Sequence, residues 1–328
     1  MNHAGFNMTP IRAGVIGVGH LGQHHARLYA SLPGTQLIGV VDLSHERAQV
    51  VAKKHGARVF LTADELLQHV DVVSVAVPTS DHYAVAKACL EAGKHILVEK
   101  PIAVTSGEAQ ELVRLAKQRG SCLQVGHSER FNPVMAMMRP YIGQPVFIEC
   151  HRLSSFSERG TDVDVVLDLM IHDIDLVLSL KPGPVEEVRA AGVAVLSSSI
   201  DIANARIQFQ SGCVANLTSS RVSTNKMRRL RLFQRDNYLS IDFQTRQGVI
   251  CRRSAKAGER PTVEAKQLQG GDEEPLKLQL ESFLHAVSTG TRPVVSGEEG
   301  AAAVEVAHQV LQAVAAFAAR HEQGGNGG

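Results

Sequence analysis

Short apolar runs alternate with segments of helical spacing throughout residues 11–125, and this alternation limits the fold more than any other feature of the sequence. The apolar runs occupy residues 13–16, 36–41, 71–77, 95–98 and 122–125. The run DVVSVAV at 71–77 is rich in β-branched residues, which is typical of a strand buried on both faces. Strands and helices that alternate in this way predict a parallel, doubly wound sheet with helices on both faces.

A glycine-rich turn follows the first apolar run. The hexapeptide GVGHLG at 17–22 has the spacing GxGxxG between a predicted strand and a predicted helix. In such a turn, Gly17 allows the tight bend, Gly19 lets the backbone approach a pyrophosphate, and Gly22 lets the helix pack close to the strand. Asp42 ends the second apolar run, where a carboxylate holds the 2′-hydroxyl of a ribose and repels a 2′-phosphate. The residue after it is not an arginine, so we expect NAD as the cofactor in preference to NADP.

The pattern changes after residue 126. The sequence predicts a helix at 133–141, a strand at 146–152 and a long helix at 163–180. Further strands are expected at 185–195, 202–209, 213–219, 229–234, 238–243 and 248–252, with hairpin turns between several of them. The polar segment 255–274 is expected to be a loop, and two closing helices are expected at 276–288 and 297–321.

These elements predict an α/β protein with two domains. We expect a Rossmann domain with a doubly wound parallel sheet at 11–126, and an α+β domain with an open, mostly antiparallel sheet at 127–322. The second domain would bind the substrate and form oligomers. The tails at 1–10 and 323–328 are expected to be flexible and disordered.

The tripeptide Glu99-Lys100-Pro101 follows the apolar run 95–98. Loops at the carboxyl ends of strands form the ligand crevice of a doubly wound sheet. A lysine there is able to hydrogen-bond a substrate hydroxyl, or to accept its proton if the lysine pKa is lowered. On its own, however, the tripeptide is better explained by a solvated surface lysine.

Asp168, His172 and Asp175 lie on one face of the helix predicted at 163–180. A carboxylate, an imidazole and a second carboxylate in one stripe indicate a base and the groups that orient it. A capped and salt-bridged helix would give the same pattern. We expect no metal site, because a third ligand is lacking in the sequence nearby.

Composition narrows the possible functions. The chain contains 34 Lys and Arg against 33 Asp and Glu, so we expect neither a nucleic acid nor a membrane surface as a partner. Five scattered cysteines without a CxxC pair argue against disulfides and structural zinc, and for a reducing compartment. The first residues lack the pattern of a secretory signal, and polar residues interrupt the apolar stretch 301–319, so a cytoplasmic protein is expected.

Together, the motifs make this sequence resemble the Gfo/Idh/MocA family of nicotinamide-dependent sugar oxidoreductases. The resemblance is carried by Gly17, Gly19, Gly22, Pro78, Thr79, His82, Glu99, Lys100, Pro101, Asp168, His172 and Asp175. It implies that NAD is bound by Gly17, Gly19, His20, Leu21, Gly22, Asp42, Pro78, Thr79, His82, Glu99 and Lys100. It also implies that Lys100 and His172 form the acid/base pair, with Asp168 holding the substrate or tuning Lys100. Which member of the pair is the base stays open.

A narrower resemblance rests on VGHSERFNP at 125–133 and DLMIHDID at 168–175. Both segments are similar to the dehydrogenases of this family that oxidise the 3-hydroxyl of UDP-N-acetylglucosamine, whose ketone a partner aminotransferase converts to an amino sugar for lipid A. A diphosphate needs cationic partners. The substrate-binding residues expected are therefore Arg130, Asn132, Arg152, Arg159, Asp168 and His172, although each arginine would fit a surface position equally well.

Two alternatives stay open: a dehydrogenase of a free polyol such as inositol or of another sugar nucleotide, and a catalytically silent NAD-binding regulator. An open sheet face must be covered, so we expect a homodimer or a homotetramer. The histidines at 20, 24 and 25 resemble a metal cluster, but their place in the first helix predicts packing and local hydrogen bonds instead.

Overall fold

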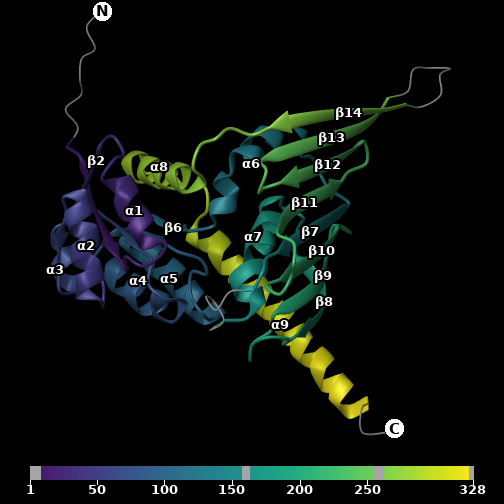
Figure 1. The fold of residues 1–328 in the computed structure, drawn as a ribbon, viewed down its shortest axis with the longest axis horizontal. Helices are drawn as coiled ribbons and strands as arrows, with labels where there is room; N and C mark the ends of the chain where they lie inside the picture. The colour runs from purple at the N-terminus through teal and green to yellow at the C-terminus, as the bar shows by residue number, and fades with distance from the viewer. Residues whose placement is uncertain (1–8, 157–162, 255–261, 325–328) are drawn as a thin grey trace, which may run out of the picture. The chain divides into compact units, whose positions relative to one another are not determined.

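The structure is a computed structural model, and it describes residues 9–156, 163–254 and 262–324. The chain divides into two compact units (Figure 1). The first comprises Met1–Gly126 and Leu276–Ala301, and the second comprises His127–Pro275 and Ala302–Gly328. The sequence-based boundaries differ from this division, because they place all of 276–301 in the second domain.

The first unit contains a six-stranded sheet in which every neighbouring pair is parallel, in the order β3-β2-β1-β4-β5-β6. Its strands are β1 (Ile11–Ile16), β2 (Thr35–Val41), β3 (Arg58–Val59), β4 (Val72–Val75), β5 (His95–Val98) and β6 (Leu123–Val125). Its helices are α1 (Gly22–Tyr29), α2 (His45–His55), α3 (Ala63–Leu67), η1 (Thr79–Asp81), α4 (His82–Glu91), α5 (Ser106–Arg119) and α8 (Pro275–Thr289). The predicted Rossmann topology is confirmed.

Helix α8 explains why a late segment joins the first unit. Leu280 and Phe283 of this helix are fully buried in one apolar cluster with residues of α1, α2, β1 and β2. The sequence shows that α8 has an apolar face, but it does not show which sheet that face covers. The local sequence pattern therefore does not predict that α8 packs against elements far earlier in the chain.

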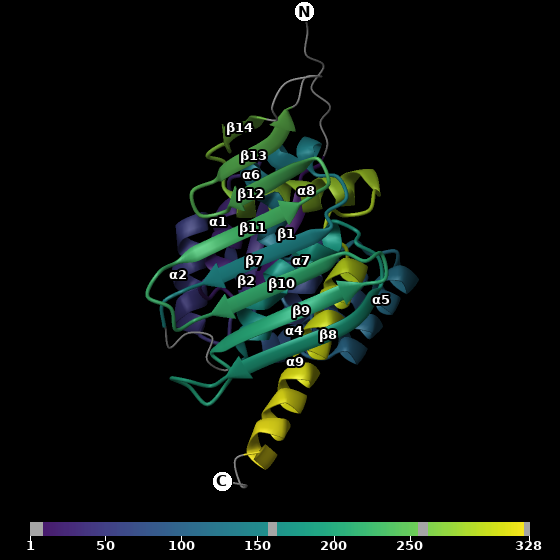
Figure 2. The same cartoon turned by 90° about the vertical axis from the view of Figure 1, so that its right-hand side faces the viewer.

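The second unit contains an eight-stranded sheet in the order β14-β13-β12-β11-β7-β10-β9-β8 (Figure 2). Its strands are β7 (Phe147–Leu153), β8 (Val185–Val193), β9 (Ile202–Phe209), β10 (Val214–Ser220), β11 (Met227–Phe233), β12 (Asn237–Asp242), β13 (Gln247–Ser254) and β14 (Thr262–Gln269). Strands β7 and β10 are parallel and the other neighbours are antiparallel, so the predicted mostly antiparallel sheet is confirmed.

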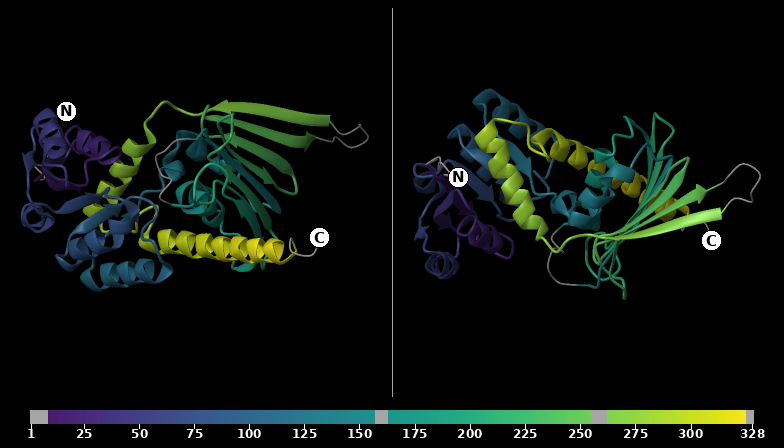
Figure 3. Two further views of the ribbon diagram at one scale, coloured as in Figure 1. Left: turned by 60° about the horizontal axis from the view of Figure 1, so that its bottom comes forward. Right: turned by 90° about the horizontal axis from the view of Figure 1, so that it is seen from above.

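Helical segments of the second unit lie on one face of this sheet (Figures 2 and 3). They are η2 (Ser128–Phe131), α6 (Pro133–Met138), η3 (Arg139–Tyr141), the π-helix η4 (Val166–Met170), α7 (Ile171–Ser179) and the later part of α9 (Gly297–Gly324). Side chains of β7 alternate between buried and half-buried, as a sheet covered on one face requires. Within the described part of the unit, the other face carries no helix.

One expectation for the second unit was wrong, and another, a helix at 163–180, is confirmed with an unexpected geometry at its start. Residues 262–269 form the strand β14, although 255–274 was expected to be a loop. Every residue of β14 except Leu268 is exposed, so the strand lacks the apolar alternation that would have revealed it. The helix expected at 163–180 begins instead with the π-helix η4, which continues into α7.

By length and composition alone, residues Gly297–Arg320 of α9 would be able to cross a membrane, and 33% of its most apolar window is buried within the protein. Core helices of water-soluble proteins meet the same criterion, so this observation carries little weight.

Candidate active site

The glycine turn between β1 and α1 has the shape that the sequence predicts. Gly17 has a φ of 83°, and a Cβ atom on it would lie 2.6 Å from the carbonyl oxygen of Ala76. A Cβ on Gly22 would lie only 1.8 Å from the carbonyl oxygen of Gly17. Gly19 differs, because no atom lies within 4 Å of the place where its Cβ would be. The turn therefore needs two of its glycines for its own shape and leaves open space at the third. The exposed residues His20 and Leu21 continue it.

Asp42 holds this turn from the end of β2. Its carboxylate accepts hydrogen bonds from the backbone N–H groups of Val18 and Ser44, both at 2.8 Å. The guanidinium of Arg47 also reaches it, with Nη2 3.0 Å from Oδ1. The Asp42 side chain is 7% exposed and that of Arg47 is 52% exposed. An exposed cation thus stands beside the carboxylate on which the expected preference for NAD rests.

His82 connects the loops that follow β4 and β5. Its Nδ1 lies 2.6 Å from the carbonyl oxygen of Pro101, and its Nε2 lies 3.0 Å from that of Val77. The side chain is almost fully buried, and burial lowers the pKa of His82. Both ring nitrogens of His82 therefore contact backbone carbonyl groups of the protein. The neighbouring Pro78 is exposed, and Thr79 is half-buried.

Glu99 is held by a buried hydrogen-bonded chain. Its Oε1 lies 3.0 Å from Nε2 of His25, and Nδ1 of His25 lies 2.9 Å from the hydroxyl of Ser74. The hydroxyl of Tyr29 also lies 2.9 Å from that of Ser74. His25 is thus buried and hydrogen-bonded within the protein, but its partners come from β4 and from the turn after β5, not from its own helix as expected. These contacts fix the turn at which the half-buried Lys100 stands.

The first unit thus gathers its predicted residues at one edge of the sheet. The glycine turn, Asp42, Pro78 and Lys100 follow β1, β2, β4 and β5 respectively. Because these strands are parallel, their carboxyl ends share one edge, where dinucleotides bind in folds of this kind.

In the second unit, the π-helix η4 and helix α7 carry the predicted acid/base residues. Asp168 lies in η4, and His172 is the second residue of α7; both are half-buried. The ring of His172 meets that of His127 edge-on, with centroids 6.0 Å apart. Asp175 is buried, and its Oδ1 lies 3.6 Å from Nη1 of Arg130.

Arg152 does not have the surroundings expected of a substrate ligand. Its side chain is 5% exposed, with Nη1 2.9 Å from Glu129 and Nη2 2.9 Å from Asp173. Burial disfavours the charged guanidinium, but Asp173 and Glu129 outweigh this cost and raise the pKa of Arg152. A guanidinium committed to two buried carboxylates positions α7 against η2, so the geometry replaces the predicted ligand contact with a structural one.

Asn132 also bonds within the protein. It caps α6 by accepting a hydrogen bond from the N–H of Val134 at 3.3 Å, and its amide donates to the carbonyl oxygen of Phe243 at 3.2 Å. Its predicted substrate contact is therefore not favoured by the geometry. Arg159 lies outside the described residues.

Comparison with known proteins gives the chain a family. Residues 11–127 match the model described as an oxidoreductase family with an NAD-binding Rossmann fold, and residues 138–239 match the GFO/IDH/MocA C-terminal domain. Over 315 residues, the chain is 40% identical to the UDP-N-acetylglucosamine 3-dehydrogenase of Acidithiobacillus ferrooxidans, covering 95% of this chain and all of that protein (100%). The chain belongs to the Gfo/Idh/MocA family of oxidoreductases.

A solved structure of the Acidithiobacillus ferrooxidans enzyme superposes on this chain with a TM-score of 0.89 and 40% sequence identity. The superposition covers 94% of this chain and 99% of the solved chain. Inositol 2-dehydrogenase of Rubrobacter xylanophilus is 33% identical over 193 residues, which cover 56% of each chain. The Gfo/Idh/MocA resemblance, the oxidoreductase class and NAD as the cofactor are confirmed. The first unit fits NAD physically, because Gly19 leaves room for a pyrophosphate beside the turn.

Several groups of this site were not predicted from the sequence. Arg47 stands one helical turn into α2, and the helix start at Ser44 is the only local signal that would have placed it near Asp42. The partners Glu129 and Asp173 of Arg152 lie in the two segments that carry the narrower resemblance. The presence of an acidic residue in each of these two segments was the one sign in the sequence that they share a buried cation, which is Arg152.

Proposed function

We propose that this protein uses NAD to oxidise the 3-hydroxyl of UDP-N-acetylglucosamine to a 3-keto sugar nucleotide. The observation that carries the proposal is the 40% identity to an enzyme of that name over 95% of the chain. Identity over the full length includes both the cofactor-binding unit and the unit that holds Asp168 and His172. The matching motifs at 125–133 and 168–175 support the same substrate.

In this proposal, the first unit binds and orients the cofactor. The backbone of the glycine turn, with His20 and Leu21, holds the pyrophosphate, and Asp42 holds the adenosine ribose. Pro78 and Thr79 line the nicotinamide, and the chain His25–Glu99 fixes the turn of Lys100. NAD, when bound, supplies the hydride acceptor at C4 of its nicotinamide.

The protein's own contribution to the chemistry is to move one proton and to hold the sugar. Lys100 or His172 accepts the proton of the 3-hydroxyl, and Asp168 holds the substrate or tunes Lys100. Arg130 lies in the narrower motif, with Nη1 3.6 Å from Oδ1 of Asp175, and we assign its guanidinium to the diphosphate.

The test is NADH formation from NAD and UDP-N-acetylglucosamine in the presence of a carbonyl trap. The trap is needed because the oxidation of an alcohol by NAD is often unfavourable at equilibrium. We expect NADH together with a trapped ketone at position 3 of the sugar. Lys100→Met should abolish turnover while NADH binding, followed by fluorescence, stays unchanged. Full turnover in this variant would remove Lys100 from the mechanism.

Two other functions are outcomes of the same assay. Turnover of free inositol without UDP would favour a polyol dehydrogenase, which the 33% identity to an inositol 2-dehydrogenase makes worth measuring. Stable NADH binding without turnover of any sugar would favour a regulator. If the 3-keto product forms, its consumer would be a partner aminotransferase in the cytoplasm, which makes the amino sugar used in lipid A.

We also propose that the open face of the second unit's sheet joins copies of this chain. Phe147, Phe233 and Tyr238 form a row on it, with neighbouring ring centroids 5.5 and 5.0 Å apart. Phe233 remains 37% exposed in the single chain. An apolar row of this kind favours association, so light scattering should show a dimer or a tetramer. Phe233→Glu should shift the mass toward the monomer, whereas Leu43→Glu, on the first unit, should not. A monomeric parent protein would contradict the proposal.

A further inference from the structure

A single buried carboxylate organises the segment between β8 and β9. Asp201 is fully buried directly before β9. Its Oδ2 accepts hydrogen bonds from the backbone N–H groups of Val195, Leu196 and Ser197 at 2.8, 2.6 and 2.9 Å. Its Oδ1 accepts a hydrogen bond from the Ser197 hydroxyl at 2.7 Å. Burial opposes the ionisation of Asp201, but the bonds from Ser197 and Arg221 outweigh it and hold the pKa of Asp201 well below its usual range.

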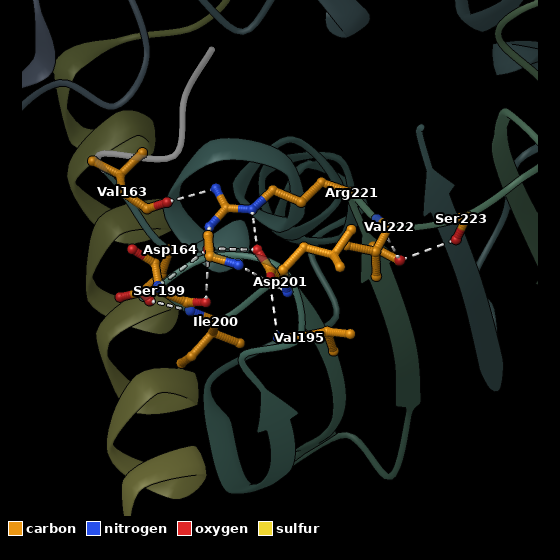
Figure 4. A network of polar contacts seen from close by, with 12 residues as sticks. Val163, Asp164, Val195, Ser199, Ile200, Asp201, Arg221, Val222 and Ser223 are labelled. Atoms are coloured by element: carbon orange, nitrogen blue, oxygen red, sulfur yellow. Dashed lines mark hydrogen bonds and ion pairs between the residues drawn. The ribbon is translucent and has the colours of Figure 1, made fainter. Parts of the chain in front are cut away.

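Arg221, directly after β10, connects this carboxylate to the chain ahead of the π-helix (Figure 4). It is 3% exposed, and its Nε lies 2.8 Å from Oδ1 of Asp201. Its Nη1 donates to the carbonyl oxygen of Val163 at 2.8 Å, and its Nη2 donates to the Ser197 hydroxyl at 3.2 Å. One guanidinium therefore bonds to a carboxylate and a hydroxyl of the segment between β8 and β9, and to a backbone carbonyl just before η4.

The residues after Val163 are bonded to the same region. The carboxylate of Asp164 accepts a hydrogen bond from the N–H of Ile200 at 3.0 Å (Figure 4). The N–H of Val165 donates to the carbonyl oxygen of Ile200 at 3.0 Å, and the N–H of Asp168 donates to that of Asp164 at 2.9 Å. The chain is thus bonded to the segment between β8 and β9 immediately before it enters the π-helix.

We propose that Asp164, Asp201 and Arg221 are positioning residues for the oxidation. They fix the point at which η4 begins, and so the directions in which Asp168 and His172 point. This inference rests on the proposed function. A π-helix is rare and is frequently found at functional sites. A buried ion pair adds little net stability, and its best attested use is to select one arrangement of the chain.

The test separates the placement of η4 from general stability. Asp164→Ala removes the bond to Ile200 and leaves the buried ion pair intact. With the substrate that the parent enzyme oxidises, we expect kcat to fall about tenfold, because Asp168 and His172 are held less accurately at the transition state, while the affinity for NADH stays unchanged. Asp164→Asn keeps the accepting oxygen and should restore kcat.

Ser223→Ala is the matched control. It removes the bond between Ser223 and Ser220, at 3.0 Å, on the side of the network away from Val163 (Figure 4). Its kinetics should equal those of the parent. The limb of the kcat pH profile that belongs to the acid/base pair should shift in Asp164→Ala and not in the control, since a merely structural loss would leave it in place.

Hydrogen exchange supplies a readout that does not depend on the substrate. The amides of residues 165–172 should exchange at least about tenfold faster in Asp164→Ala than in the parent or in Ser223→Ala. Unchanged exchange would overturn the inference, and so would kinetics equal to those of the control. If the parent does not oxidise UDP-N-acetylglucosamine, the proposed function fails, but the exchange experiment still decides whether Asp164 positions η4.

Discussion

The two units hold their functional residues by different physical means. At its glycine turn, the first unit relies on backbone geometry: Gly17 and Gly22 shape a turn that no larger residue would allow, and Asp42 binds a backbone N–H of that turn. The second unit relies on buried charge, in Arg152 with its two carboxylates and in Arg221 with Asp201. A glycine turn is specified by neighbours in the sequence, whereas a buried ion pair joins distant segments.

This difference decides what each unit tolerates. A backbone turn fails when an atom is added, because there is no space for it. A buried ion pair fails when one partner is removed, because the remaining charge is left without compensation. Substitutions that add or remove atoms therefore test the two units separately.

The largest effect should come from the second unit. Arg152→Met leaves Glu129 and Asp173 buried without their shared cation, and should lower the free energy of unfolding by about 3–5 kcal/mol. Urea denaturation followed by circular dichroism measures it. Arg189→Met removes a pair with Glu187 whose side chains are 75% and 46% exposed, and should change stability by less than about 0.5 kcal/mol. Equal effects of the two substitutions would refute the claim that burial of the ion pair sets the cost of losing its arginine.

Adding one methyl group should disable the first unit's turn. Gly22→Ala places Cβ 1.8 Å from the Gly17 carbonyl oxygen, so the turn must shift. We expect the affinity for NADH to fall at least about 100-fold, or about 2.7 kcal/mol, in a fluorescence titration. Gly107→Ala in α5 meets no atom within 4 Å and should bind NADH like the parent. Normal binding by the Gly22 variant would show that the turn is not the pyrophosphate site.

A smaller effect concerns the choice of cofactor. Asp42→Ala removes the carboxylate that Arg47 contacts and leaves that exposed guanidinium available to a 2′-phosphate. The ratio of kcat/KM for NADP to that for NAD should rise about tenfold, a change of about 1.4 kcal/mol. Asp42→Ala with Arg47→Ala should lose this gain. If the double variant keeps it, Arg47 has no part in cofactor selection.

The smallest expected effect is a dependence of stability on pH. Burial lowers the pKa of His82, so the unfolded chain binds a proton more readily than the folded one. The resulting stability is fully present above the unfolded pKa of about 6.5 and is lost as the pH falls below it. His82→Gln should flatten the decline in urea denaturation between pH 7 and 5.5, whereas His69→Gln, at an exposed position, should not. An identical decline in both would assign it to other groups.

The sequence predicted the first unit better than the second, and the reason is physical. The glycine spacing and the strand-helix alternation are local, so they predicted the turn at Gly17 and the topology around it. Strand β14 is exposed except at Leu268 and pairs with β13, and the local sequence pattern does not show this pairing. Arg152 lies in strand β7, whose side chains alternate between buried and half-buried in the ordinary way. Its partners Glu129 and Asp173 approach it only in the folded chain.

The predicted acid/base residues show the same limit. Helical spacing was enough to group Asp168 with His172. It could not show the π-helix, because that geometry depends on bonds from Ile200 and Arg221, far along the chain.

The place of α8 has a consequence for the order in which the protein is made. Leu280 and Phe283 complete the apolar cluster of the first unit, yet the ribosome synthesises them after nearly all of the second unit's sheet. Part of the apolar surface of the nascent Rossmann sheet therefore stays uncovered while strands β7 to β14 leave the ribosome. The unit that begins first is completed late, and this interval is when the growing chain is most exposed to aggregation and to chaperones.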